Sequence, residues 1–464
     1  MTLLQHLESE GHGLAVCKIR LETPLIGEVR RTTVVFELSI GTEPLGSLTI
    51  PAAEIGVPLN QSEAQKRQRS DDGYRISESL VDFARHVLPP SEPLYIVFDS
   101  PSGYLPGVPW EKLVTAQIER PVLRLGAVPV QPVRSNRALH IACCCCPPGD
   151  SESRWQVVRQ FIHSFPRDLP RQTQLHVFVD VEIYPRVLAE TAAFGNVRVY
   201  DPADAARYAS EEFASANSSE ASELENPWLQ WIKDSLKQLS VDGVHFLTMG
   251  ELGRTRPAII FTRPPLGGDD YAWSPMVGSR HLAGFLEQVG AWAVCFGSSP
   301  GNLSLFGLRM FFDEIAHMVT GPAALHDMAG DPNGEALRQL YRYMFAPEQA
   351  SLPYSPALAL ATHPDWIAKV NSQPSKRLEQ LIDEYSLSSR VPELKGEFDA
   401  PAWVTAQQRS IEKTIGKLGA LPETGVALNR EQGVLDALKF TSDLVAKYAK
   451  LGGSTGGTGG GGLL

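Results

Sequence analysis

The residues of this sequence that could do chemistry stand mostly where short apolar runs end. Such runs are typical of buried strands, and in an open parallel sheet ligands bind outside the carboxyl ends of the strands. The positions that follow the runs are residues 99–103, 146–149, Asp180, residues 249–251 and residues 297–301. A catalytic residue at one of these positions needs a side chain that can accept a proton or attack carbon.

Two of the runs end in side chains that decide whether catalysis is possible. VHFLTMGEL, residues 244–252, ends its strand at Met249, and a thioether cannot accept a proton near neutral pH. AWAVCFGSS, residues 291–299, leads to Ser298, whose hydroxyl is a poor nucleophile without a neighbouring base. Cys295 lies inside the second run, where a buried core thiol is more common than a reactive one.

Histidines outside these strand ends are the remaining candidates for a base. His245 lies four residues before Met249, or about 13 Å along an extended strand, whereas a proton transfer needs about 3 Å. We therefore expect His245 to be a core histidine. Three further histidines lie on expected helices or strand ends: His281, His317 and His326. One of these could approach Ser298 or Cys295, so a relocated catalytic dyad stays open.

Four consecutive cysteines, Cys143–Cys146, end the run LHIACCCC. Successive side chains of a strand point to opposite faces, so the four thiols cannot all face one metal ion. The spacing of Cys143 and Cys146 is C-x-x-C, but no second pair completes a zinc site. A buried strand end is the favoured interpretation, with metal or redox use as the alternative.

Other chemical signals are weak. The sequence has no phosphate-binding glycine loop after a strand, no Gly-x-Ser-x-Gly turn and no His-Glu-x-x-His motif. We therefore expect neither a cofactor nor a bound metal. Asp269 and Asp270 in PPLGGDDYAW fit a solvated turn, with a substrate-facing loop as the alternative.

Composition narrows the possible partners. The formal net charge of the 464 residues is −11, and no basic patch is evident, which argues against nucleic acid and anionic membrane as partners. No apolar run approaches the length of a membrane span, and the first residues, MTLLQHLESEGHG, lack the features of a secretory signal. We expect a cytoplasmic protein with reduced thiols.

The elements that must position these residues fall into four regions. Residues 1–90 contain strand-like runs at 14–21, 31–40 and 46–50 and a helix at 76–87, which predicts a small β-rich region. Residues 91–350 alternate strands and helices, which indicates an α/β domain with a mostly parallel sheet flanked by helices. Residues 351–451 turn helical, and residues 452–464 form a glycine-rich tail that is either a flexible end or a segment that a partner recognises or processes.

Individual runs make the alternation explicit. The strands expected in the α/β domain are 93–100, 137–144, 174–181, 196–202, 243–250 and 291–297, with weaker candidates at 257–263 and 321–327. The expected helices include 151–165, 226–239 and 279–290, and those of the extension are 374–387, 401–419 and 428–452. Residues 208–225 are rich in Ala, Ser and Glu and predict a surface loop.

Two stretches together resemble CHAT domains, which are caspase-like peptidases. PLYIVFDSPSGYLPGVPWEKLV, residues 93–114, is similar to the lead-in of that family, a strand followed by Asp-Gly and by Leu-x-x-Pro-Trp-Glu-x-Leu. The runs at 244–252 and 291–299 are similar to its catalytic pair of strands. In the family, the first of these ends in His-Gly, with this histidine as the general base, and the second ends in the nucleophilic cysteine.

The departures from the family pattern fall on its catalytic positions. Val244, His245, Phe246 and Gly250 match the first strand, but Met249 stands at the position of the base. Ser298 stands at the position of the nucleophile. The resemblance therefore implies a caspase-like fold, spanning about residues 91–350, whose catalytic dyad is degenerate.

The function expected from the resemblance is that of a catalytically inactive binding, regulatory or substrate component in a bacterial protease-linked defence or signalling system. Its partner would be a protein or peptide, possibly a protease, docked where the family holds its substrate. The residues expected to line that surface are Gly250, Glu251, Gly297, Ser299, Asp269 and Asp270. The alternatives are an active cysteine peptidase that uses Cys295 with a relocated base, and an unrelated doubly wound binding protein. The oligomeric state is left open.

Overall fold

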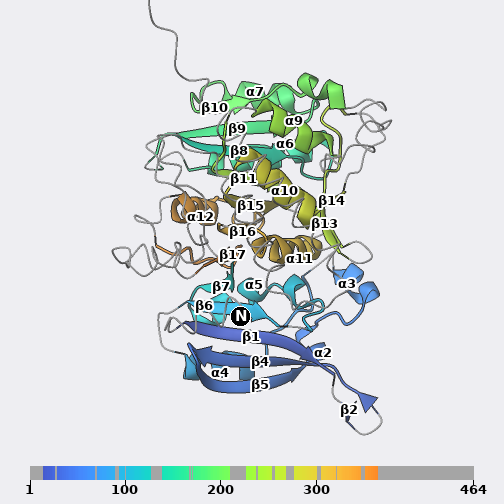
Figure 1. The fold of residues 1–464 in the computed structure, drawn as a ribbon, viewed down its shortest axis with the longest axis vertical. Helices are drawn as coiled ribbons and strands as arrows, with labels where there is room; N and C mark the ends of the chain where they lie inside the picture. The colour runs from blue at the N-terminus through green and yellow to red at the C-terminus, as the bar shows by residue number, and fades with distance from the viewer. Residues whose placement is uncertain are drawn as a thin grey trace, which may run out of the picture.

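One long sheet runs from β10 at the top of Figure 1 to β5 at the bottom, and its central strands β11 and β15 are buried on both faces. The computed structural model describes residues 14–23, 25–26, 29–67, 71–88, 93–99, 101–126, 138–166, 169, 171–208, 226–236, 239–252, 256–267, 276–299, 305–319, 321–345 and 351–363. Within these residues the sheet has 12 strands in the order β10-β9-β8-β11-β15-β16-β17-β7-β6-β1-β4-β5.

The strands of this sheet have the following bounds: β1 Ala15–Glu22, β4 Thr33–Ile40, β5 Glu43–Pro51, β6 Leu94–Phe98, β7 Val122–Leu125, β8 Leu139–Cys145, β9 Thr173–Val179, β10 Val197–Val199, β11 Gly243–Leu247, β15 Ala293–Ser298, β16 Ala323–Asp327 and β17 Leu358–Thr362. Neighbours from β10 to β16 are parallel, β17 runs antiparallel to β16, and β17, β7, β6 and β1 are again parallel. The last pairings, β1 with β4 and β4 with β5, are antiparallel. Two small sheets join β2 Leu25–Ile26 to β3 Val29–Arg30, and β12 Met249–Leu252 to β13 Pro257–Ile260 and β14 Met276–Gly278.

Helices cover both faces of the parallel half. The bounds are α2 Ala52–Ile55, α3 Gln61–Arg67, α4 Glu78–Val87, α5 Trp110–Ile118, α6 Ser151–Ser164, α7 Tyr184–Thr191, α9 Pro227–Ser235, α10 Ser279–Val289, α11 Leu305–Ala316 and α12 Glu335–Phe345, with 3₁₀ turns η1 Leu105–Gly107 and η2 Pro202–Tyr208. Helices α6, α7 and α12 pack on one face of the sheet, and α9, α10 and α11 pack on the other. The α/β architecture expected from the alternating runs is therefore confirmed.

Local signals explain where several helices begin and end. The Asp150 side chain accepts a hydrogen bond from the Ser153 amide at 2.8 Å and caps the first turn of α6. The Asn226 side chain does the same for α9, which starts with Pro227, where a missing amide hydrogen costs nothing. Helix α10 ends at Gly290, whose φ of 74° is left-handed and favours glycine.

The cysteine run behaves as the alternation of a strand requires. Cys143 and Cys145 belong to the core under α6 and α12, whereas Cys144 and Cys146 belong to the core under α9 to α11. All four thiols are buried and free. Because burial disfavours a thiolate, the pKa of each is raised.

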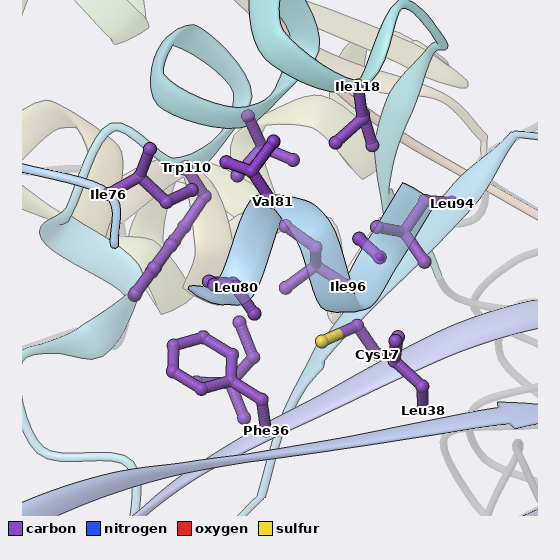
Figure 2. A pocket seen from close by; sticks show the side chains of 13 residues that line it. Cys17, Phe36, Leu38, Ile76, Leu80, Val81, Leu94, Ile96, Trp110 and Ile118 are labelled. Atoms are coloured by element: carbon purple, nitrogen blue, oxygen red, sulfur yellow. The ribbon is translucent and has the colours of Figure 1, made fainter. Parts of the chain in front are cut away.

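The N-terminal strands close over a core of their own, which includes a small cavity (Figure 2). Cys17, Phe36 and Trp110 are among the wholly apolar side chains that line its roughly 20 Å³. An apolar cavity of this size stays dry and holds no drug-sized ligand. Burial raises the pKa of the Cys17 thiol to about 12, so this thiol stays protonated near neutral pH.

Most of the expected strands and helices appear with small shifts in their ends, and the weaker candidates at 257–263 and 321–327 form β13 and β16. The single strand expected at 243–250 is instead divided between β11 and β12, which belong to different sheets. The sheet extends further than expected at two places. Strand β17 lies beyond residue 350, where the sequence analysis begins the helical extension, and β1, β4 and β5 continue the main sheet. The helices expected at 374–387, 401–419 and 428–452, the tail and nearly all of the 208–225 loop lie outside the described residues.

Candidate functional site

Strands β11 and β15 lie side by side at the centre of the parallel sheet. Gly243 pairs with Ala293 and Leu247 pairs with Gly297. Every residue of both strands is buried, as their continuous apolar runs indicate for strands covered on both faces. The residues that follow Leu247 and Gly297 therefore emerge next to each other at the carboxyl edge of the sheet, where ligands bind in this class of fold.

Met249 begins a new strand directly after β11. Thr248 is buried, and its hydroxyl donates to the Ile260 carbonyl at 2.5 Å, which fixes the bend between the two strands. Met249 then pairs with Ile260 as the first residue of β12 and is only partly buried. The thioether thus stands at the start of a small antiparallel sheet that projects from the carboxyl edge.

Gly250 is explained by close packing. An ideal Cβ at Gly250 would lie 2.2 Å from the backbone nitrogen of Leu308, in the first turn of α11. Gly307 makes the reciprocal approach, because its Cβ would lie 2.8 Å from the backbone carbon of Glu251. Helix α11 therefore rests directly on the backbone of β12, and a side chain on either glycine would force the two apart.

Ser298 ends β15 and is 1 % exposed. Its hydroxyl donates to the His326 carbonyl at 3.4 Å, and its backbone carbonyl accepts from the Met328 amide at 3.2 Å. No described imidazole or carboxylate is hydrogen-bonded to the hydroxyl oxygen, so no described residue is placed to deprotonate it. The residue after Ser298 is Ser299, which is also buried, and the residue before Ser298 is Gly297.

Cys295 lies mid-strand, and the structure pairs it in register with His245. Both residues point to the face under α6 and α12, since Cys295 shares a core with Cys143 and Val158 there. Cys295 is 1 % exposed, and burial raises the pKa of its thiol far above the usual range. The thiol therefore stays protonated and lies below the surface on which a peptide would dock.

His245 is a core histidine, as expected. Its Nδ1 lies 2.8 Å from the Tyr341 hydroxyl of α12, and its ring packs against Phe161 with the ring centroids 4.4 Å apart. Burial, and then the charge of His326, lower the pKa of His245 well below its usual value. The ring is therefore neutral, and it has no path to Met249 or to the edge.

His326 is the only one of the other three histidines that the structure brings next to the candidate positions. It pairs with Gly297, so its ring points to the face opposite the Ser298 side chain. Its Nε2 lies 2.9 Å from an Asp331 carboxylate oxygen. Only its backbone carbonyl meets the Ser298 hydroxyl, and the ring is not placed to act as the base.

A shallow hollow of about 30 Å³ lies between α11, the carboxyl end of β16 and the start of β17. Asp327, which pairs with Ser298, contributes to its wall together with Leu305, Arg309 and Pro356. Arg309 is held by two hydrogen bonds to Asp71, at 2.7 and 2.6 Å. The hollow thus combines apolar walls with a partly buried carboxylate and lies where β16 ends and β17 begins.

The edge above β8 and β9 is closed by protein contacts. Asp180, at the end of β9, is buried and paired with the buried Arg154, which also pairs with Glu182. Arg263 reaches Glu182 at 2.6 Å, and the Cys146 thiol donates to the Arg263 carbonyl at 3.7 Å. Asp180 and Cys146 were candidates as strand-end residues, and here both have structural partners.

Of the remaining candidate residues, Glu251 lies at the carboxyl edge of the sheet, and the other two are not among the described residues. Glu251 is partly buried in β12, and burial raises the pKa of its carboxyl. Asp269 and Asp270 lie outside the described residues.

Among the residues that the structure describes, no group of three or more His, Cys, Asp or Glu side chains could hold a metal ion. No helix in the described ranges is long and apolar enough to cross a membrane.

The sequence analysis missed a buried cation beside this region. Arg124 of β7 is 1 % exposed and donates to Glu111 at 2.7 Å and to Asp313 of α11 at 3.0 Å. Its guanidinium also lies over the rings of Phe98 and Phe312. The only signal for it in the sequence is a single arginine inside the apolar run VLRL.

Comparison with known proteins gives no relative from which a role can be taken: no protein-family model matches the chain, and no curated protein is similar to it.

Proposed function

We propose that this chain is a catalytically inactive protein of the caspase-like class, resembling CHAT domains, which binds a protein or peptide partner at the carboxyl edge of β11 and β15. It would act in the cytoplasm as a binding, regulatory or substrate component of a bacterial protease-linked defence or signalling system. The name of the class and the cellular setting rest on the resemblance of the motifs at 93–114, 244–252 and 291–299.

One observation carries the proposal. The two strands that resemble the catalytic pair of the family are adjacent, parallel and in register, so the residues that follow them leave the sheet at the same edge. Met249 lies two residues beyond the end of β11 and Ser298 is the last residue of β15, and neither provides an activated nucleophile. The arrangement supports a site that has kept its geometry without its chemistry.

The docking surface follows from what lies open at this edge. Met249 and Glu251 on β12 are partly exposed, and the hollow walled by Asp327 and Pro356 lies at the end of β16, the strand beside β15. Small sheets and shallow hollows of this kind accept an extended segment through backbone contacts and side-chain pockets. A peptide strand laid along β12 would place one of its side chains near the hollow.

The alternative of an active peptidase built on Cys295 gains no support from the geometry. The thiol is buried in mid-strand, and His245 beside it is held by Tyr341. The test is to incubate the protein with a broad thiol-directed peptidyl ketone and measure its intact mass. We expect no adduct, whereas an adduct that disappears in Cys295→Ala would establish the peptidase.

Partner binding is tested with a photo-crosslinking residue placed at Glu251 in the native host. The matched control places it at Glu335, an exposed position in the first turn of α12. We expect a protein crosslink from position 251 and none from position 335. Equal crosslinking at both positions, or none at 251, would refute docking at this edge.

A further inference from the structure

An apolar row crosses three neighbouring strands of the main sheet near their amino ends. Val16 of β1 pairs with Tyr95 of β6, and Tyr95 pairs with Leu123 of β7, so the three side chains stand side by side on one face. Each is the second residue of its strand, and each is 1 % exposed. Side chains buried this completely must be covered by another part of the chain. These three residues are called the apolar row below.

The described helices on this face stop short of the apolar row. Among them, α6, α7 and α12 contribute side chains to the core that contains the row, whereas the side chains of α4 and α5 belong to the core on the opposite face. Tyr341 of α12 meets β11 and Tyr343 meets β17, so this helix lies over β15 and β16, above β7, β6 and β1 in Figure 1. Adjacent strands are about 4.8 Å apart, so β1 lies about 14 Å beyond β17, out of reach of a helix about 10 Å wide.

The extent of the apolar row sets the size of its cover. Further along β1 the same face carries Lys18 and Arg20, and Arg20 is paired with Glu37 of β4. At the other end Leu14, which comes directly before β1, packs against the same core as the row. The apolar part of the face is therefore confined to the amino ends of three strands, about 10 Å across, which suits about two turns of helix.

The sequence that leads into β1 has the signals of such a helix. Residues 1–13, MTLLQHLESEGHG, lie outside the described residues and precede Leu14, so they reach the sheet at the end where the apolar row lies. Thr2 and Gln5 have the Ser/Thr-x-x-Glu/Gln spacing of a capping box, and Gly11 is typical of a helix end. These signals predict a helix over residues 3–10, which has a length of about 12 Å.

The apolar side of the predicted helix matches the apolar row. Leu3, Leu4 and Leu7 fall within about 100° of one another around a helix axis, and every other position from 5 to 10 is polar. A helix this short is marginal in water and needs an apolar surface to pack on. We infer that residues 3–10 form an amphipathic helix that packs on the apolar row through these three leucines. The helix thereby ties the start of β1 to β6 and β7.

The other undescribed segments that adjoin these strands fit the apolar row less well. Residues 127–137 follow β7 and residues 364–464 follow β17, so both leave from carboxyl ends. Because β17, β7, β6 and β1 are parallel, those ends lie opposite the edge at which the row stands. Residues 89–92 and 346–350 precede β6 and β17, and these stretches of four and five residues are too short for two turns of helix.

The inference is tested with a photo-crosslinking amino acid placed at position 7 of the full chain, at a protein concentration low enough to favour crosslinks within one molecule. The matched position is Ser9, which lies on the opposite side of the predicted helix. We expect position 7 to crosslink to residues 14–16, 94–97 or 122–125, as mapped by peptide mass spectrometry, and position 9 to give no crosslinks to these strands. The absence of such crosslinks from position 7, or equal yields from both positions, would overturn it.

A matched pair of substitutions measures what the contact contributes. Leu7→Asp and Ser9→Asp add the same charge to the same segment, but only the first places a carboxylate against the apolar row. We expect Leu7→Asp to lower the urea midpoint of unfolding and to increase the fluorescence of a dye that binds exposed apolar surface, and Ser9→Asp to leave both near the wild-type values. Equal effects of the two changes would contradict the packing. If Leu7→Asp does not fold, Leu7→Ala takes its place, with a smaller shift expected in the same direction.

Discussion

Cys295 and Ser298 lie three residues apart on β15, and their side chains face opposite sides of the sheet. The thiol lies among the core residues under α6 and α12, and the hydroxyl lies on the α11 side against the carbonyl of His326. Burial raises the pKa of the thiol and removes it from solvent, whereas no described base is hydrogen-bonded to the hydroxyl. Different physical causes therefore weaken the two candidate nucleophiles.

The first prediction concerns thiol reactivity. All six cysteines of the chain are buried and free, and thiolates are the reactive species. We expect the native protein at neutral pH to react with a coloured disulfide reagent far more slowly than the protein unfolded in urea, where all six react. A fast reaction of one thiol in the native protein would show that a cysteine is accessible, and mass mapping would identify it.

The second prediction concerns His176 of β9, whose pKa is lowered to about 4 by burial and then by the charges of His140 and Arg198. The unfolded chain binds the proton more tightly, with a pKa of about 6.5, so stability is full above that pH and falls as the pH drops towards 4. The loss from this residue is up to about 3 kcal/mol. Urea unfolding at several pH values checks it. In His176→Gln we expect a shallower loss over this range, and an unchanged slope would show that other groups cause it.

At the scale of elements, the small sheet β12–β14 and helix α11 meet through two glycines. Such contacts are invisible in a hydropathy pattern, because Gly250 and Gly307 are identified only by which backbone lies opposite. The resemblance assigned Gly250 to a catalytic motif, and the packing gives the same residue a structural role. The two roles are compatible, since the contact sets the position of Met249 and Glu251.

The third prediction tests this contact. Gly250→Ala would place a methyl group 2.2 Å from the backbone nitrogen of Leu308, which only a backbone shift can relieve. We expect a loss of about 1–3 kcal/mol in the free energy of unfolding, as for overpacked cores. Gly195→Ala is the control, because nothing lies within 4 Å of its new methyl group, and we expect a change within about 0.5 kcal/mol. Similar values for the two variants in urea titrations would contradict the packing.

At the scale of the whole molecule, one sheet joins the N-terminal strands to the parallel half through the pairing of β17 with β7. Arg124 strengthens this junction, because it bonds to Glu111 on α5 and to Asp313 on α11. Arg309 adds a second link from α11 to Asp71. The helix that follows Ser298 is thus anchored to the N-terminal region.

The fourth prediction is that Arg124→Ala destabilises the fold by about 3–5 kcal/mol, because it leaves Glu111 and Asp313 without their buried cation. The control is Arg338→Ala, which breaks a surface pair with Glu335 and should cost under about 1 kcal/mol. Denaturant unfolding of both variants gives the comparison. A small effect at Arg124 would mean that the two parts are held together by the sheet and apolar packing alone.

Much of this architecture is readable in the sequence, and the exceptions have physical reasons. Runs such as residues 243–247 and 293–298 are mostly apolar because helices cover both faces of the sheet, so composition alone identifies them. Strand β7 was not predicted, because Arg124 interrupts its apolar run. The charge of Arg124 is compensated by residues that are distant in the chain. Strand β17, LALAT, is too short and too close to a proline-rich turn to stand out.

Part of the candidate site could also be predicted from the sequence, because its two strands are mostly apolar runs. The order of the motifs located β11 and β15, and their adjacency depends on sheet order, which no local pattern contains. The partners of His245 were not foreseeable, because Tyr341 and His326 reach it from a later helix and strand. The sequence analysis nevertheless expected a core histidine there, on the distance argument alone.

The central claim is that the ends of β11 and β15 form a peptidase site without its chemistry, and restoring the two residues tests it most directly. The variant carrying Met249→His and Ser298→Cys is incubated with a thiol-directed peptidyl ketone and mapped by peptide mass spectrometry. The matched control carries Met249→His and Ser299→Cys, which places the thiol one residue further along. The account predicts labelling at position 298 of the first variant that exceeds labelling at position 299 of the control. Equal labelling of the two, or none at position 298 in a folded variant, would contradict it.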